Sequence, residues 1–138
     1  MQKIVNDIKI LKSKSKDVGY FEKFKIIKEL QTTLQNTKNG IGLSAIQIGI
    51  PKRVSIIRLP NFKINLINEE IIEKSDPIRV KDEGCLSFPG LFLDTKRYNI
   101  IKLKNGKTYT GLRAVAIQHE LDHTNGIVFL DRKWRKRK

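Results

Sequence analysis

The stretch GLRAVAIQHELDHTNG, from Gly111 to Gly126, holds both histidines of this 138-residue chain. Its apolar residues recur at helical spacing and it ends at the pair Asn125-Gly126, which predicts a helix with Thr110 as its N-cap. Apolar side chains occupy nearly every side of this helix: Leu112, Val115 and Ala116 on one side, and Ala114, Ile117 and Leu121 on another. A helix of that kind belongs in the middle of a fold.

His119 and His123 lie four residues apart in this helix, with Glu120 directly after the first. That spacing separates two side chains by about 40° around the axis and about one turn along it, so both imidazoles can reach one metal ion. Glu120 is rotated away from this line but can reach a ligand of the ion. In this H-E-x-x-H arrangement the glutamate handles the protons of a metal-bound water. The alternative is two helical histidines satisfied by local hydrogen bonds.

A catalytic metal site of this kind needs a third protein ligand. Only fifteen residues follow His123, and Asp131 is the one candidate among them. Upstream, the segment KDEGCLSFPG carries the single cysteine, Cys85, which offers a soft thiolate donor. One cysteine and two histidines with an open fourth position form an accepted catalytic set. A lone cysteine is otherwise often a small buried hydrophobic residue, but beside this histidine pair we expect Cys85 to be the third ligand.

The composition indicates a soluble globular protein, with 39% hydrophobic and 30% charged residues. Its length suits one domain, so we expect a single catalytic domain over residues 1–138 with a basic tail at 132–138. No apolar run approaches the roughly 20 residues of a membrane helix, and no secretory signal is visible. One cysteine excludes an internal disulfide, and a cytoplasmic location is the expectation.

The net charge is +14, from 28 basic and 14 acidic residues. Six of the seven residues in the tail are basic, and without them 22 basic residues still face 14 acidic ones, a balance of +8. This basicity would draw the chain toward polyanions such as RNA or ribosomes. Alternatively, it reflects a lysine-rich coding bias and a solvated surface.

Two further patterns complete the expected α+β fold with a mainly antiparallel sheet. Apolar spacing predicts a helix over residues 20–38, and the segment NGIGLSAIQIGIP (39–51) suggests either close backbone approach to a ligand or a turn leading into a strand. The expected strands are 53–59, 63–72, 85–88, 98–104 and 107–111, the last two joined as a hairpin by a two-residue turn at Asn105-Gly106.

Together, GIGLSAIQ, EGCLS and QHELDH resemble, in order and in residue identity, the three signature motifs of the peptide deformylases. ILKSKSKDV, LINEEI and NGIVFLDR resemble other segments of the family, so the resemblance covers nearly the whole chain. It implies a peptide-deformylase-like fold, with an N-terminal helix and mainly antiparallel β-sheets around a central helix that carries H-E-x-x-H.

The resemblance implies that Cys85, His119 and His123 bind one divalent metal ion, Fe(II) in the cell, with Zn(II), Ni(II) or Co(II) tolerated. The implied substrates are N-formylmethionyl peptides of nascent chains, and the implied product is formate. It further implies a monomer that does not associate with membranes.

The resemblance also implies the catalytic roles. Glu120 activates the metal-bound water and later protonates the leaving amine, while the metal, the side-chain amide of Gln47 and the backbone N–H of Leu86 hold the oxyanion. The residues implied for substrate binding are Ile41, Leu112, Val115 and Ala116 around the methionine side chain, Gly42 and Gly90 along the substrate backbone, and Arg97 near the entrance. A structural surface role is the alternative for Arg97.

Three departures from the family pattern are Ser44 for a usual Ala, Glu69 for a usual Pro and Thr124 for a usual Leu, none of them expected to touch a ligand. Bacterial members generally carry a long C-terminal helix associated with ribosome docking, whereas this sequence ends after KWRKRK. It resembles in this respect the short members carried by bacteriophages, which implies the cytoplasm of a bacterial host.

Two rival functions are also compatible with the sequence. The first is a peptidase that shares H-E-x-x-H. The second is a basic RNA- or ribosome-binding module, suggested by the charge and by Trp134 within the basic tail, whose metal is purely structural. Structural zinc is normally closed by four protein ligands, and the sequence supplies three good soft or imidazole donors.

Overall fold

The computed structural model describes residues 3–38 and 40–135. Within them the helices are α1 (Ile8–Leu11), α2 (Glu22–Gln35) and α3 (Gly111–Thr124), and the short 3-10 turns are η1 (Ala45–Ile48) and η2 (Phe129–Arg132). One antiparallel sheet contains β1 (Gly42–Ser44), β2 (Val54–Leu59) and β3 (Phe62–Ile67), in that order. The other contains β4 (Ile71–Gly84), β5 (Phe92–Leu103) and β6 (Thr108–Thr110).

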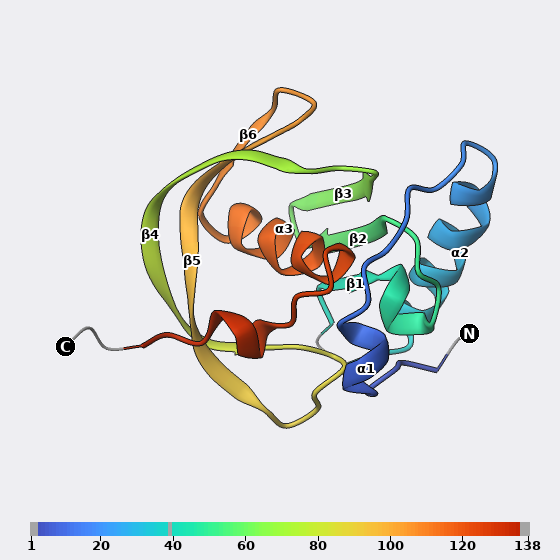
Figure 1. Ribbon diagram of the computed structural model, residues 1–138, viewed down its shortest axis with the longest axis horizontal. Helices are drawn as coiled ribbons and strands as arrows, with labels where there is room; N and C mark the ends of the chain where they lie inside the picture. The colour runs from blue at the N-terminus through green and yellow to red at the C-terminus, as the bar shows by residue number, and fades with distance from the viewer. Residues whose placement is uncertain (1–2, 39, 136–138) are drawn as a thin grey trace.

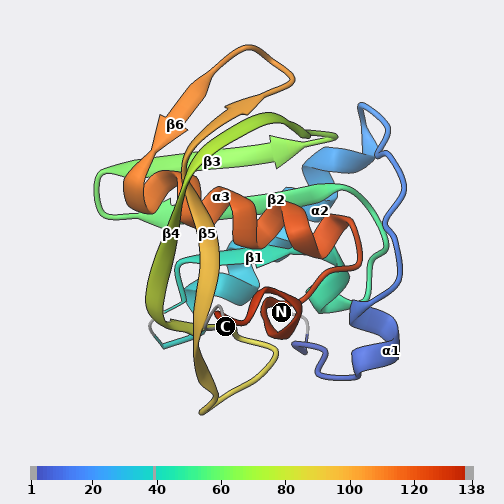
Figure 2. The ribbon, with the colours of Figure 1, turned by 60° about the vertical axis from the view of Figure 1, so that its left-hand side comes forward.

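Helix α3 lies between the two sheets, as Figures 1 and 2 show. It contacts β1 and β2 of one sheet and β5 and β6 of the other, and ten of its residues are buried. The expected α+β fold with the H-E-x-x-H helix at its centre is therefore confirmed. None of the helices in the described ranges is long and apolar enough to cross a membrane.

The first sheet is covered on both faces, because successive residues of a strand point to opposite sides. On β2, Ile56 belongs to the core cluster packed with α2, whereas Ile57 belongs to the cluster packed with α3. On β1, Leu43 joins the α2 cluster, while the backbone of Gly42 and the hydroxyl of Ser44 lie against Glu120 of α3. The alternation of β1 thus brings a glycine and a serine to the helix that carries His119 and His123.

Helix α2 is shorter than the expected 20–38. The helix ends at Gln35. The next two side chains, of Asn36 and Thr37, donate hydrogen bonds back to the carbonyls of Thr32 and Leu34 and compete with continued helical bonding. The single-turn helix α1, whose first turn is capped by the Asp7 side chain, was not expected. It is too short to show a helical period.

The expected strand over residues 63–72 is wrong, since it divides between two sheets. Asn68 takes a left-handed conformation with φ of +51°, and its side chain bonds both the N–H and the carbonyl of Val18. The chain therefore leaves the first sheet after Ile67 and enters the second at Ile71. Asparagine tolerates this conformation better than most residues.

The expected strand over residues 85–88 is also wrong. These residues form a turn in which the Phe88 N–H bonds the Cys85 carbonyl. A run of four mixed residues does not separate a turn from a strand by periodicity alone. The turn places Cys85 directly above α3.

The hairpin between β5 and β6 is confirmed, but its loop has three residues instead of two. The Leu103 N–H bonds the Lys107 carbonyl, which leaves residues 104–106 as the loop, with Gly106 at φ of +91°. A glycine in this conformation at the third position is the usual solution for a three-residue hairpin loop.

We expect Gly126→Ala to destabilise the protein strongly. Gly126 follows α3 with φ of +74°, and a Cβ there would lie 2.5 Å from the backbone oxygen of Lys12. The left-handed conformation costs roughly 1–2 kcal/mol for alanine, and overpacking adds about 1–3 kcal/mol. Gly111→Ala is the matched control, because its φ is +63° but nothing lies within 4 Å of the added Cβ. Equal losses of unfolding free energy in urea titrations would contradict the role of the close contact.

Candidate metal centre and its cleft

A cleft of about 550 Å³ opens between β1, the segment around the β4–β5 turn and α3. The amide end of Gln47 and the side chains of Cys85, His119 and Glu120 line it together with apolar residues. A concave, largely apolar site with a few convergent polar groups is the usual form of a small-ligand site.

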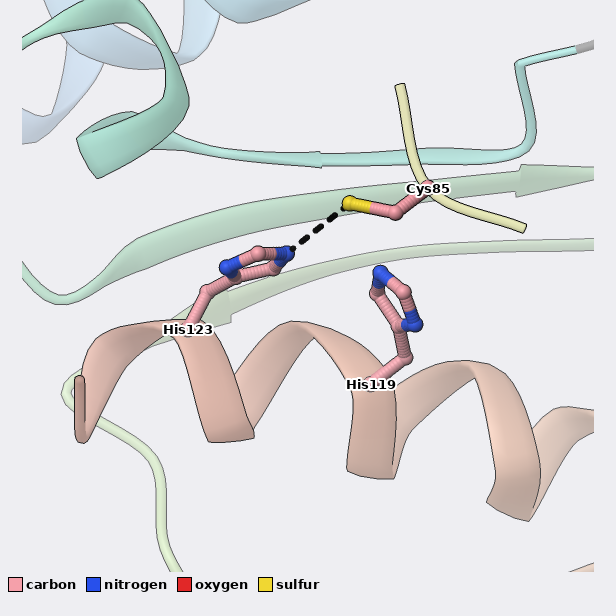
Figure 3. A group of neighbouring side chains, drawn as sticks. All are labelled: Cys85, His119 and His123. Carbon is pink, nitrogen blue, oxygen red and sulfur yellow. Dashed lines mark hydrogen bonds between the residues drawn. The ribbon is translucent and has the colours of Figure 1, made fainter. Parts of the chain in front are cut away.

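Cys85, His119 and His123 converge at this cleft, and one ligand atom from each lies within 4.8 Å of the others. Figure 3 shows Cys85 on the same side of α3 as the two imidazoles, with its sulfur directed at His123. The distance between Cys85 Sγ and His123 Nε2 is 3.5 Å. Ligand atoms bound to one tetrahedral ion lie about 3.3–3.6 Å apart, so the arrangement fits a metal ion after a small closure. The donor set, one thiolate and two imidazoles, suits Zn or Fe and leaves one position open.

Glu83 orients the first histidine. Its carboxylate lies 2.8 Å from His119 Nδ1, which leaves His119 Nε2 to face Cys85 and His123. Burial would raise the pKa of Glu83, but hydrogen bonds from His119 and Arg97, together with their charges, hold that pKa well below its usual range. A carboxylate behind a metal-binding histidine fixes the orientation of the ring and makes the ligand more basic.

Arg97 is not near the substrate entrance, and this expectation is wrong. Its side chain is 2% exposed and lies behind the candidate metal ligands, where it bonds Glu83 at 2.6 Å and Asp122 at 2.6 Å. It is not a surface residue either. Arg132, at the end of η2, bonds the same Asp122 at 2.9 Å. The chain Arg132, Asp122, Arg97, Glu83 and His119 thus links the C-terminal segment to one of the three candidate metal ligands.

Sequence reasoning did not single out Glu83 or Asp122. Both stand inside quoted motifs, EGCLS and QHELDH, so a signal was present. Their shared partner, Arg97, could not be identified from the sequence. Its position depends on the antiparallel register of β4 and β5, which places Arg97 opposite Ile78 with its side chain turned inward.

Glu120 lies beside the triad with its side chain almost fully buried. Its Oε1 accepts a hydrogen bond of 3.0 Å from the Ser44 hydroxyl. Burial raises the pKa of Glu120, an effect that the His119 charge and the Ser44 hydrogen bond oppose. A buried carboxylate with a raised pKa is suited to accept and return a proton near neutral pH.

Gln47 and Leu86 lie at the same cleft. The Gln47 amide is fixed at its oxygen by the Ser44 N–H at 3.0 Å, so its Nε2 faces Ser87 Oγ at 3.1 Å and Cys85 Sγ at 3.6 Å. The Leu86 N–H takes part in none of the turn and loop hydrogen bonds of the described residues. The Gln47 amide nitrogen is therefore held beside Cys85, and Leu86 belongs to the same cleft.

Six of the residues expected to bind substrate line this one cleft: Ile41, Gly42, Gly90, Leu112, Val115 and Ala116. Their contacts with a substrate stay a prediction. Two of them are largely open to solvent, since Ile41 is 44% and Leu112 is 62% exposed. These apolar groups at the mouth of a cleft are the kind of surface that an apolar side chain of a ligand covers.

Comparison with known families matches the polypeptide deformylase family over residues 1–138. The chain belongs to the polypeptide deformylase family. A peptide deformylase from Aquifex aeolicus is 38% identical to this chain over 146 aligned positions. The alignment covers 93% of this chain and 85% of the relative. The deformylases are enzymes, and their known activity is the metal-dependent hydrolysis that deformylates nascent peptides.

Solved deformylase structures share the fold. The crystal structure of the Thermotoga maritima enzyme superposes with a TM-score of 0.82 at 32% identity, over 98% of this chain and 99% of that one. The Synechococcus elongatus deformylase in complex with actinonin superposes with a TM-score of 0.84 at 33% identity, over 99% of this chain and 79% of that one. The deformylase fold of this chain therefore agrees with its family.

Proposed function

We propose that Cys85, His119 and His123 hold the divalent ion of this deformylase and that Glu120, Gln47 and Leu86 carry the hydrolysis of N-formylmethionyl peptides. The observation that supports this most directly is the convergence of the three donors, the buried Glu120 carboxylate and two hydrogen-bond donors on one apolar cleft. Residues 1–138 together serve as the single domain that supports this site.

A divalent ion bound by the triad would supply a Lewis acid and a water of lowered pKa. Glu120 accepts a proton from the attacking water at its carboxylate and returns it to the amine that leaves. Gln47 Nε2 and the Leu86 N–H donate to the oxygen that develops negative charge on the formyl group. Because the Ser44 N–H holds the Gln47 amide oxygen, the amide nitrogen needs little reorganisation during the reaction.

The substrate is held by the apolar side of the cleft. Val115 and Ala116 precede His119 by one turn of α3, so a methionine side chain packed against them would bring its formyl group toward the ligands. Ile41 and Leu112 cover the same side chain from the rim, while the backbone at Gly42 and Gly90 lies along the peptide. A formyl group allows a closer approach to the ligands than a longer acyl chain does, which separates this activity from that of a peptidase.

We expect the activity to depend on the ion and to return with it. Treatment with 1,10-phenanthroline should abolish formate release from formyl-Met-Ala-Ser, and anaerobic addition of Fe(II) or of Ni(II) should restore it, with one equivalent of metal bound per chain. We propose Fe(II) as the ion in the cell, with Zn(II), Ni(II) or Co(II) as substitutes. Unchanged turnover in the chelated, metal-free protein would contradict the assignment.

Besides the peptide substrate, we propose the ribosome as a partner, because a net charge of +14 attracts polyanions. Within the basic tail, Arg132 bonds Asp122 and Lys133 pairs with Thr95, so these two residues have structural partners, and residues 136–138 lie outside the described ones. Removal of 135–138 alone should therefore reduce co-sedimentation with ribosomes at low salt and leave the fold intact. Equal co-sedimentation of the full and the shortened chain would contradict a role of the tail in ribosome binding.

That the protein is a monomer, encoded by a phage and located in the cytoplasm of a bacterial host, stays a prediction.

A further inference from the structure

Two serines form a buried pair beneath the Glu120 carboxylate. Ser44 and Ser55 lie directly opposite each other in the register of β1 and β2, and both are 0% exposed. Their hydroxyl oxygens are 2.7 Å apart. A hydroxyl pair between two otherwise apolar clusters costs desolvation unless each group finds a partner, so its position next to Glu120 needs a reason.

The number of protons at Ser44 indicates the direction of its hydrogen bonds. Ser44 Oγ has three neighbours, Ser55 Oγ at 2.7 Å, Glu120 Oε1 at 3.0 Å and the Glu120 carbonyl at 3.1 Å, but a hydroxyl carries one proton. A carboxylate is the strongest of these acceptors. Ser44 therefore donates to Glu120 Oε1, and Ser55 donates to Ser44.

The other carboxylate oxygen is confined by backbone. A Cβ built on Gly42 would lie only 2.5 Å from Glu120 Oε2, which means that this oxygen lies against the Gly42 main chain. Ser44 and Gly42 are alternate residues of β1 and share the face that meets α3. The strand thus holds one oxygen by a hydrogen bond and limits the other by contact, so a side chain with three rotatable bonds is kept in one orientation.

We propose that Ser44, supported by Ser55, is a positioning residue that sets the orientation of the Glu120 carboxylate for proton transfer. This rests on the role of Glu120 in the proposed function. The Ser44 hydroxyl contacts the carboxylate that moves the proton in that function. It therefore helps to fix the geometry of the group that acts as acid and base.

Three variants test the proposal: Ser44→Ala, Ser55→Ala and the double variant. Ser44→Ala should lower kcat about 10-fold, because a small misplacement of a reacting group costs one to two orders of magnitude. The KM for formyl-Met-Ala-Ser and the bound metal per chain should stay within twofold of the parent. Ser55→Ala should change kcat less than threefold, since Ser44 keeps its bond to Glu120.

Thermal unfolding separates positioning from stability. Ser44→Ala leaves the Ser55 hydroxyl buried without its partner, so its unfolding midpoint should fall. In the double variant both hydroxyls are absent, so none is buried without a partner. Its unfolding midpoint should therefore recover, while its kcat stays about 10-fold below that of the parent. Recovery of kcat in the double variant, or a parental kcat in Ser44→Ala, would overturn the proposal. A rise in KM with unchanged kcat would overturn it as well.

A crystal structure of Ser44→Ala gives a readout that does not depend on activity. The Glu120 side chain should adopt a different rotamer or two rotamers, whereas an unchanged single orientation would contradict the proposal. If the parent protein with one equivalent of Ni(II) releases no formate, the proposed function fails, and this crystal structure still decides whether Ser44 orients Glu120.

Discussion

Replacing Glu120 with alanine is expected to lower kcat for formate release on the order of 1,000-fold, within the range that general acid–base catalysis contributes. Of the two cleft carboxylates beside the triad, that of Glu83 is paired with Arg97 and His119, so we expect Glu120 to be the one that acts on the water. Its loss removes the acceptor for the proton of the attacking water. Formate can be followed with formyl-Met-Ala-Ser as substrate.

The controls for this variant address the metal and the specificity of the change. Because Glu120 is not a ligand, the variant should retain its ion, as measured by elemental analysis of the same preparation. Glu73→Ala, at an exposed position of β4, should keep parental activity. Full activity in Glu120→Ala would refute the mechanism while leaving the family membership intact.

Replacing Arg97 with alanine is expected to have the largest effect on stability, a loss of about 3–5 kcal/mol in the free energy of unfolding. The guanidinium is 2% exposed and neutralises both Glu83 and Asp122. Its removal leaves two carboxylates without their shared cation in a buried setting. For a chain of this size the unfolding midpoint should fall by roughly 10–15 °C.

Arg79→Ala is the matched control, because Arg79 also pairs with an acidic residue, Asp94, at 2.7 Å but is 50% exposed. Exposed ion pairs contribute about 0–1 kcal/mol, so its midpoint should move little. Similar losses for the two arginines in a thermal scan would show that the buried network does not carry the stability assigned to it. Reduced metal content in Arg97→Ala would further indicate that Glu83 no longer holds His119.

Much of the fold could be predicted where the signal is local. The period of α3, its start after Thr110 and the hairpin around Asn105-Gly106 follow from backbone preferences of neighbouring residues, although Thr110 makes no side-chain cap hydrogen bond and the hairpin loop has three residues instead of two. The same reasoning was wrong at residues 85–88, where four residues are too few to show a period. It was also wrong at residues 63–72, where a side-chain bond from Asn68 to a distant segment interrupts the strand.

The residues of the candidate site likewise separate into those with a local sequence signal and those that depend on long-range contacts. Two histidines one helical turn apart can be recognised as a metal site from their spacing, since the geometry that unites them lies within one helix. Cys85 could be proposed because the chain offers few other donors. The burial of Arg97 could not be predicted, because a charged residue in a strand is normally assigned to the surface.

The chemistry of the ligands and the position of the central helix were therefore readable from residue type and local periodicity. The partners of Arg97 and Ser44 were decided by the pairing of β4 with β5 and by the packing of β1 on α3. The physical reason is that a hydrogen bond between residues far apart in the chain depends on strand register and side-chain direction. A shift of one residue in β1 would turn Ser44 away from Glu120 and place Leu43 against it instead.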